Sequence, residues 1–292
     1  MSEDGFDGFA GLAEARVAVL GLGLMGGSLA LALRGRCASL TGFDPDPHIL
    51  RLAEQQHVVD LASLDLEAVL PESDLVVLAA PVLANLDLLK SLDSFHPGPA
   101  VIVDLSSTKA QIVAAMANLP ERFDPLGGHP MCGKEKASLV NADPLLYQGA
   151  VFALVSLPRT SDRARRLAQE LVAAIGSQVL WLEPDVHDRW VAATSHLPYL
   201  LANALTLATP AEAATLAGPG FFSTSRLAAS FAPMMLDVLQ TNRQNILEAL
   251  QSFRDSLEEF ELCLRREDFE ALGSLLHSSA RQHERFSSRQ VL

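Results

Sequence analysis

Up to Leu182 the chain alternates between short apolar runs and longer amphipathic stretches. The short runs are rich in β-branched residues, which favours strands, and the stretches between several of them favour helices. The predicted strands are 16–20, 40–43, 75–80, 101–105, 123–126, 150–155 and 179–182. This alternation predicts an α/β fold: a doubly wound, mostly parallel sheet with helices on both faces.

After Glu183 the pattern changes to helix alone. From Leu239 onward apolar side chains recur at spacings of three and four, which predicts one long helix with an apolar seam. The seam positions are Leu239, Ile246, Leu250, Phe253, Leu257, Phe260 and Leu264. Arg243 occupies the one position that interrupts the seam. Such a seam packs either within its own domain or against a second subunit.

A glycine-rich turn joins the first predicted strand to a helix predicted at 28–33. Its residues are Gly21, Leu22, Gly23, Leu24, Met25 and Gly26. In the dinucleotide-binding fingerprint the first glycine permits a tight turn and the second lets the backbone approach a pyrophosphate. The third lets the helix press against the strand while its free N–H groups face the phosphates. The strand before the turn and the helix after it favour a cofactor site over a purely structural turn.

Asp44 follows the second predicted strand, about twenty residues after the glycines, where the fingerprint places a carboxylate for the adenosine ribose. A carboxylate accepts hydrogen bonds from a ribose 2′-OH and repels a 2′-phosphate. Asp44 therefore favours NAD over NADP, and its alternative role is that of a turn residue before Pro45. Pro81, directly after the 75–80 strand, completes the predicted cofactor-binding set.

Composition excludes several classes of protein. The net charge of −13 argues against a nucleic-acid partner, which a basic patch usually marks. The longest apolar run, 75–84, falls short of the ~18 residues that suggest a membrane span. Cys37, Cys132 and Cys263 are widely spaced without ligand-like pairing. This pattern argues against disulfides and structural zinc and favours a cytoplasmic protein that binds no metal.

The segment from Asp104 to Lys109 reads Asp-Leu-Ser-Ser-Thr-Lys and leads from the 101–105 strand into a helix. Its hydroxyl groups suit the N-terminus of a helix, and we expect at least one of them to cap it. The turn also lies at the carboxyl edge of the sheet, where doubly wound folds bind ligands. Ser107 is therefore a candidate to contact both substrate and nicotinamide.

His129 lies in the sequence Gly-Gly-His-Pro-Met-Cys-Gly, after the strand predicted to end near Leu126. We expect the two glycines to let the backbone come close to a ligand, while Pro130 restricts the chain behind the ring. A neutral histidine can accept a hydroxyl proton as hydride leaves the same carbon, so His129 is the candidate catalytic base. A structural histidine is the alternative. Cys132 lacks a base partner by spacing, and we expect a small apolar wall residue there.

The helical part contains two further candidates. Pro198 lies inside the otherwise helical run 186–208, which predicts a break or kink near Thr194. His196, beside that break, is either a pocket residue or a buried structural one. Arg226 suits a bidentate contact to a carboxylate, and a surface or dimer salt bridge is its alternative.

These motifs together resemble the prephenate and arogenate dehydrogenases of tyrosine biosynthesis. The matching segments are Gly21-x-Gly23-x-Met25-Gly26, Ser107-Thr108-Lys109, His129-Pro130-Met131, Ser195-His196-Leu197-Pro198 and Gly220-Phe-Phe-x-x-x-Arg226. The resemblance implies an N-terminal Rossmann-type nucleotide domain and an all-helical dimerisation domain. It also implies an NAD(P)-dependent oxidative decarboxylation that gives a 4-hydroxyphenyl product.

The resemblance further implies a role for each candidate residue. His129 takes the ring hydroxyl proton, Ser107 hydrogen-bonds near it, and Arg226 holds a substrate carboxylate. His196 joins the substrate-binding set, and Glu135 corresponds to an acidic residue near the pocket mouth. Some family members carry a second histidine after the Leu-Pro pair, where this chain has Tyr199. The contact of Tyr199 to substrate is therefore open, as is the choice between prephenate and arogenate.

We expect a flexible leader at 1–14, a dinucleotide-binding domain at 15–184 and a helical substrate and dimerisation domain at 185–292, assembled as a homodimer. The length of 292 residues suits two domains. Two alternatives differ from this prediction. The β-hydroxyacid dehydrogenases share the glycine opening but use a lysine from the second domain, and no lysine follows Lys136 here. A dinucleotide-sensing dimer without turnover would not need His129 and Arg226.

Overall fold

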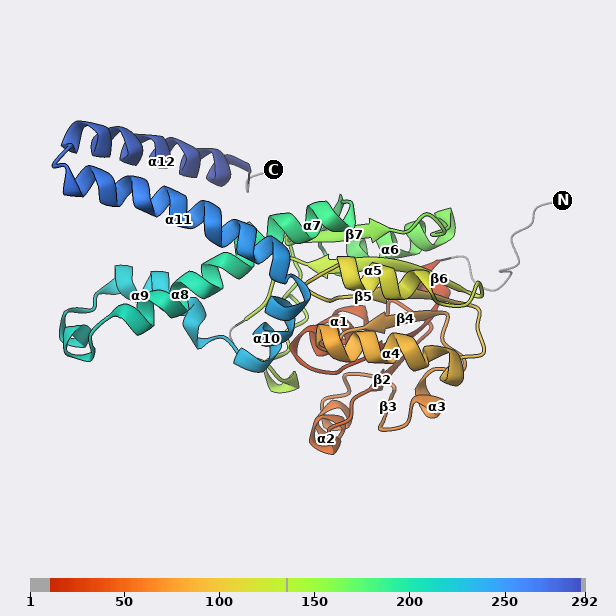
Figure 1. Ribbon diagram of the computed structural model, residues 1–292. Helices are drawn as coiled ribbons and strands as arrows, with labels where there is room; N and C mark the ends of the chain where they lie inside the picture. Colours follow the sequence, from red (N-terminus) through yellow and green to blue (C-terminus); the bar gives the residue numbers. More distant parts are fainter. Residues whose placement is uncertain (1–10, 135, 290–292) are drawn as a thin grey trace. The chain divides into compact units, whose positions relative to one another are not determined.

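The computed structural model describes residues 11–134 and 136–289 (Figure 1). Eight strands form one sheet in the order β3-β2-β1-β4-β5-β6-β7-β8. They are β1 (Arg16–Leu20), β2 (Ser39–Phe43), β3 (Leu61–Ser63), β4 (Leu75–Leu78), β5 (Ala100–Asp104), β6 (Phe123–Pro130), β7 (Val151–Ser156) and β8 (Gln178–Trp181). Neighbouring strands are parallel except β6 and β7. The predicted mostly parallel α/β fold is confirmed.

Helices cover both faces of this sheet. They are α1 (Leu24–Leu33), α2 (Pro47–Gln55), α3 (Leu66–Val69), α4 (Val82–Phe95), α5 (Ala110–Ala117) and α6 (Asp162–Ala174). Alternate residues of β1 enter different cores: Val17 and Val19 pack with α1, α2 and α6, whereas Ala18 and Leu20 pack with α3, α4 and α5. Because side chains alternate along a strand, one apolar run supplies both layers.

The strand order places a switch point beside β1. β2 lies on one side of β1 and β4 on the other, so the connections leave in opposite directions. Open α/β sheets bind their ligands in the crevice at such a point, outside the carboxyl ends of the strands. The glycine turn after β1 and Ala79 after β4 lie at this edge.

Strand β6 is longer than the sequence predicts. We expected it to end near Leu126, yet Gly127 to Pro130 continue it by antiparallel pairing with β7, and His129 lies opposite Ala153. His129 is therefore held in the sheet and does not follow it in a loop. The short strand β3 also escaped prediction, since Leu61–Ser63 lacks an apolar run.

After Glu183 the described residues contain helices alone. These begin with α7 (Pro184–Val191), a π-helical turn (Ala192–His196) and α8 (Leu197–Ala208). The 3-10 turn Ala211–Leu216, α9 (Pro219–Ser225), the 3-10 turn Arg226–Ala229 and α10 (Ala232–Thr241) follow. The break predicted near Thr194 is confirmed as the π-helical turn. It widens the helix just before Pro198, where a regular backbone hydrogen bond cannot form.

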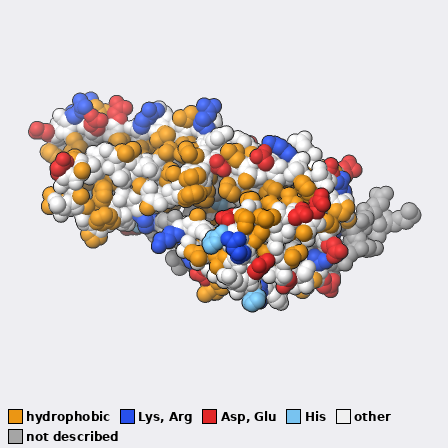
Figure 2. All heavy atoms as spheres, turned by 90° about the horizontal axis from the view of Figure 1, so that it is seen from below, with side chains coloured by type: hydrophobic (Ala, Val, Ile, Leu, Met, Phe, Trp, Pro, Cys, Tyr) orange, Lys and Arg blue, Asp and Glu red, His pale blue; other side chains and the backbone are white. Residues whose placement is uncertain are grey.

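A second compact unit starts at Gln244. It consists of α11 (Arg243–Arg265), which begins one residue earlier, and α12 (Phe269–Arg289). The single long helix predicted from Leu239 is wrong at its start, because α10 ends at Thr241 and Leu239 belongs to α10. Asn242 interrupts the helix with φ −119° and ψ 23°. Figure 2 shows one face of the whole chain, on which hydrophobic side chains lie at the surface among charged ones.

Two predictions concern the ends and borders of the domains. Residues 1–10 of the predicted leader lie outside the described residues. The remainder includes a 3-10 turn, Leu12–Glu14, and Leu12 is buried in the core. Pro184 lies within the first compact unit, and a domain border near it stays a prediction. Within the described chain, each helix is too short or too polar to cross a bilayer.

Candidate active site

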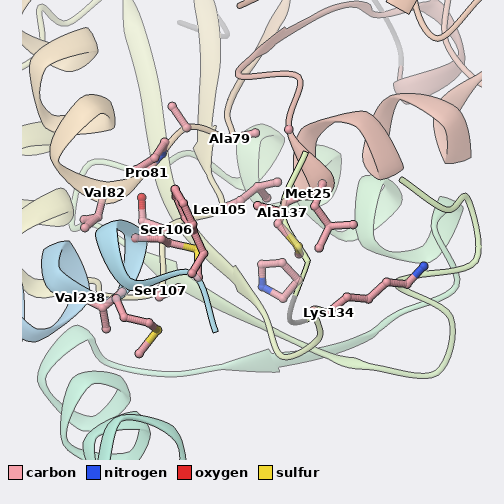
Figure 3. A pocket seen from close by; sticks show the side chains of 18 of the residues that line it. Met25, Ala79, Pro81, Val82, Leu105, Ser106, Ser107, Lys134, Ala137 and Val238 are labelled. Carbon is pink, nitrogen blue, oxygen red and sulfur yellow. The ribbon is translucent and has the colours of Figure 1, made fainter. Parts of the chain in front are cut away.

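A cavity of about 290 Å³ opens at the carboxyl edge of the sheet. The glycine turn, the segments after β4 and β5, strand β6 with its following loop, and α10 all contribute to it. Its lining includes Gly23, Leu24, Met25, Pro81, Ser106, Ser107, His129, Cys132, Met234 and Val238. In Figure 3 Pro81, Val82 and Ser106 lie on one side, with Met25 and Ala137 on the other. The structure thus brings His129 and Ser107 to one cavity with part of the predicted cofactor set.

The geometry of the glycine turn fits a dinucleotide. Gly21 has a φ of +101°. A Cβ on Gly26 would lie 1.8 Å from the carbonyl oxygen of Gly21, so α1 can approach β1 this closely only without a side chain there. A Cβ on Gly23 would have no neighbouring atom within 4 Å. Gly23 also lines the cavity, so there is room for a pyrophosphate beside its backbone. The first N–H groups of α1, which start at Leu24, face this space without a side-chain cap.

Asp44 supports the glycine turn directly. Its Oδ2 accepts a hydrogen bond from the backbone N–H of Leu22 at 2.9 Å, and its Oδ1 accepts one from Asp46 N at 3.0 Å. The carboxylate therefore serves as a turn residue, and its contact to an adenosine ribose stays a prediction. The Leu22 side chain is fully buried against Gly42, so only the backbone of Leu22 can contact a ligand at this turn.

The three hydroxyl residues after β5 have different environments. Ser106 Oγ accepts a hydrogen bond from Asn85 Nδ2 at 2.9 Å, and Thr108 Oγ1 lies 2.9 Å from Thr241 Oγ1. Ser107 lines the cavity, and its Oγ has no partner among the described residues. Ser107 is thus the hydroxyl of this turn that is left to meet a ligand.

None of these hydroxyls caps α5, so the predicted capping is wrong. The cap comes from Asp188 on α7. Asp188 Oδ1 accepts a hydrogen bond from Lys109 N at 2.7 Å, and Oδ2 accepts one from Ala110 N at 2.9 Å. A carboxylate from a distant helix therefore satisfies the free N–H groups and the positive end of α5.

His129 stands between the cavity and a second histidine. Its side chain is buried, and Nδ1 lies 2.9 Å from Nε2 of His187. Burial lowers the pKa of His129 well below 6.5, and the nearby His187, Lys109 and His196 lower it further. The ring is therefore neutral at pH 7. A neutral imidazole at the wall of a cavity can act as a proton acceptor.

A buried polar network that the sequence did not reveal surrounds His129. His187 Nδ1 lies 2.8 Å from Asp188 Oδ1. Lys109 Nζ forms an ion pair with Asp104 and donates to the carbonyl oxygen of Gly128 at 2.6 Å. All four side chains are almost completely buried. The network ties β5, β6 and α7 together behind His129.

Charge within this network is balanced by hydrogen bonds. Burial alone would raise the pKa of Asp188, but hydrogen bonds from His187 and from the amides of Ala110 and Lys109 outweigh it and lower that pKa. Burial lowers the pKa of Lys109, and the charges of Asp104 and Asp188 offset part of that effect. Asp188 is therefore ionised at neutral pH.

Gly128 has a different role from the one predicted. A Cβ there would lie 2.5 Å from the backbone oxygen of Asp104 and 2.8 Å from the Phe152 ring. The missing side chain therefore lets β6 approach the end of β5 rather than a ligand. Beyond the network, Cys132 lines the cavity, and burial raises its thiol pKa to about 11. It is a neutral wall group at pH 7.

Three candidates from the helical part do not line this cavity. His196 is buried, its Nδ1 lies 3.2 Å from Asn242 Nδ2, and burial is the main cause that lowers its pKa to about 4. Tyr199 is buried on α8, and Arg226 is exposed where α9 ends. Glu135 lies outside the described residues. The substrate-binding roles of these residues stay predictions.

Comparisons with known proteins identify both parts of the chain. Residues 29–181 match the nucleotide-binding domain of prephenate dehydrogenase, and residues 183–278 match its dimerization domain. The chain is 27% identical over 268 residues to the prephenate dehydrogenase of Lactococcus lactis subsp. cremoris, covering 88% of this chain and 73% of that relative.

Two solved structures are similar over nearly their whole length. Prephenate dehydrogenase from A. aeolicus, in complex with hydroxyphenyl propionate and NAD+, matches with a TM-score of 0.85 and 26% identity over 94% of this chain and 99% of that one. Synechocystis arogenate dehydrogenase matches with a TM-score of 0.80 and 26% identity over 93% of this chain and 99% of that one. With both domains matched in order, the chain belongs to the prephenate dehydrogenase family, as its motifs predict.

Proposed function

We propose that this chain catalyses the NAD-dependent oxidative decarboxylation of prephenate to 4-hydroxyphenylpyruvate. The observation that carries the proposal is the convergence of His129, Ser107 and the glycine turn on one cavity. A dinucleotide-sensing dimer would need the turn alone. It would have no use for a buried histidine network beside an unpartnered hydroxyl.

The cofactor proposal rests on the glycine turn and Asp44. Gly23 and the first turn of α1 would hold the pyrophosphate, and Asp44 would accept hydrogen bonds from the adenosine ribose. The negative charge of Asp44 disfavours the 2′-phosphate of NADP. When bound, the nicotinamide supplies the hydride acceptor.

His129 and Ser107 would handle the proton of the substrate. His129 Nε2 accepts the ring hydroxyl proton as the hydride leaves the same carbon, and Ser107 Oγ holds that oxygen by a hydrogen bond. The bond between the ring and its carboxylate then breaks, CO2 leaves, and the electron pair completes the aromatic ring. The phenolic oxygen recovers its proton from His129, so the step consumes and releases no net proton.

The match to a dimerization domain supports a homodimer. Leu257, Leu264, Leu276 and Phe286 of α11 and α12 are each more than half exposed, which is unusual for large apolar side chains. Light scattering on the purified protein measures the assembly, and a monomer at assay concentration would contradict this proposal. The cytoplasmic location remains a prediction from the cysteine pattern.

The test is turnover by the purified protein with prephenate or arogenate, each with NAD+ and NADP+. We expect NADH from prephenate, and no reduced cofactor with either substrate would overturn the proposal. Faster turnover of arogenate, which carries an amino group in place of the keto group, would instead identify an arogenate dehydrogenase. His129→Asn should lower kcat by about 10²- to 10⁴-fold without changing the Kd for NAD+, because it removes only the proton acceptor.

A further inference from the structure

The two ring nitrogens of His129 have different surroundings. Nδ1 is occupied by its contact to His187 Nε2, 2.9 Å away. Nε2 has no hydrogen-bond partner in the described part of the chain, and it is accessible from the cavity that His129 lines. Nε2 is thus the nitrogen that can reach a substrate. It can accept a proton only if the neutral ring carries its hydrogen on Nδ1.

The position of that hydrogen can be traced from Asp188. The carboxylate accepts from Lys109 N, Ala110 N and His187 Nδ1 at 2.7, 2.9 and 2.8 Å. An ionised carboxylate can only accept hydrogen bonds, so Nδ1 of His187 must carry a hydrogen. In neutral His187 the other nitrogen, Nε2, is then an acceptor. It faces His129 Nδ1, which must therefore be the donor.

A doubly protonated His187 would reverse this order. Its Nε2–H would donate to His129 Nδ1, and neutral His129 would then carry its hydrogen on Nε2 and could not act as the base. Two features oppose that state. Asp188 is already stabilised by two amides at the positive end of α5, and the His187 ring is almost completely buried, so no solvent would stabilise a charge on it.

We infer that His187 and Asp188 are positioning residues that hold His129 with Nδ1 protonated and Nε2 free to accept the substrate's hydroxyl proton. The catalytic meaning of this assignment rests on the proposed function. The same arrangement suits the protonated ring, because Nδ1–H keeps its acceptor when Nε2 gains a proton. Asp188 thus acts on the base through His187 and has a second role as the cap of α5.

The tautomer can be measured without turnover. NMR of the full chain with 15N-labelled histidine, at pH 7 and without ligands, distinguishes protonated from unprotonated ring nitrogens. His129→Asn and His187→Gln assign the two rings. We expect an unprotonated Nε2 and a protonated Nδ1 on His129. A protonated Nε2 on His129, or two protonated nitrogens on His187, would overturn the inference. If the tautomer is as expected but no substrate is oxidised, the proposed function fails and the assignment stands.

Asp188→Asn tests the link to catalysis. An amide cannot accept from all three donors. We therefore expect the hydrogen of His187 to move from Nδ1 to Nε2, where it donates to His129 Nδ1. The hydrogen of neutral His129 then lies on Nε2. We expect kcat to fall by about 10²- to 10⁴-fold, in line with other histidine bases whose orienting carboxylate is lost, with an unchanged Kd for NAD+. Asp185→Asn, an exposed carboxylate on the same helix, is the matched control and should keep wild-type kcat. A wild-type kcat in Asp188→Asn would overturn the inference.

Because Asp188 also caps α5, its variant can fail to fold, and a second pair keeps the test decisive. His187→Gln retains an oxygen that can accept the hydrogen of His129 Nδ1, whereas His187→Leu does not. We expect the glutamine variant to keep at least about tenfold more kcat than the leucine variant, the value of one hydrogen bond to a charged ring. Equal kcat values would show a purely structural role and overturn the inference.

Discussion

The proposed cofactor end of the cavity is formed by neighbouring residues of one turn, whereas the proposed catalytic end is assembled from residues that are distant in sequence. Gly21–Gly26 act through their backbone, and a single carboxylate, Asp44, supports them. The catalytic end depends on side chains from β5, β6 and α7, all buried. The first is a local property of the chain, and the second exists only after the sheet and α7 have packed.

The two ends should therefore fail in different ways. Damage at the cofactor end should change affinity and cofactor choice while the fold persists. Damage at the catalytic end should lower stability together with turnover, because its charged groups have no water to replace a lost partner. The following predictions test this difference, beginning with the largest expected effect.

Lys109→Met should destabilise the protein by about 3–5 kcal/mol, because it leaves Asp104 buried without its cation. Chemical denaturation measures the free energy of unfolding. Lys90→Met is the matched control, since Lys90 pairs with Asp87 at 2.7 Å on the surface of α4, where solvent replaces the partner. If the two variants lost similar stability, the catalytic end would not depend on its buried ion pair.

The pH dependence of stability should show the burial of His196. Its pKa is about 4 in the folded protein and near 6.5 when exposed. The unfolded chain therefore binds more protons between these values, so stability falls as pH drops below about 6.5. The loss from this group should reach about 2 kcal/mol at pH 5 relative to pH 7.

His196→Asn removes this titration, and denaturation at pH 7 and pH 5 measures the difference. The variant should lose less stability on acidification than the wild type. His48→Asn, at an exposed position on α2, is the control and should follow the wild type. An unchanged pH dependence in His196→Asn would show that His196 is not held neutral by the fold.

The smallest effect is expected from Asp44→Asn. The amide keeps an acceptor for Leu22 N but loses the charge that repels a 2′-phosphate. The preference for NAD+ over NADP+, as a ratio of kcat/KM values, should fall on the order of tenfold, with unchanged unfolding free energy. Asp46→Asn, which alters the neighbouring N-cap of α2, is the control. A retained preference would locate cofactor discrimination elsewhere.

The sequence predicted the features that depend on local patterns. Strand β1 and the glycine turn carry both an apolar run and residues that permit their geometry, so each was recognisable without the rest of the chain. The kink beside Thr194 followed from Pro198, whose ring excludes a regular helix there. The family resemblance combined these local signals in order, and the domain matches confirm it.

The features missed depend on packing between distant segments. The true length of β6 comes from pairing with β7, which a run of glycines does not indicate. Nothing in the sequence around Lys109 shows that its ammonium is buried beside Asp104. The adjacent His187 and Asp188 on an amphipathic helix were a usable signal, because charged side chains on a buried face need partners. Asn242 separates α10 from α11, and its side chain binds the carbonyl oxygen of Asp188 and lies beside His196, contacts that helical spacing cannot show.

The hydrogen-bonded chain from Asp188 through His187 to His129 crosses the border between the two matched domains. His129 belongs to the segment that matches the nucleotide-binding domain, whereas His187 and Asp188 belong to the segment that matches the dimerization domain. A chimera that exchanged the helical part between two relatives would keep its base but inherit a foreign pair to orient it. The turnover of such a chimera would therefore measure how well the foreign pair keeps the hydrogen of His129 on Nδ1.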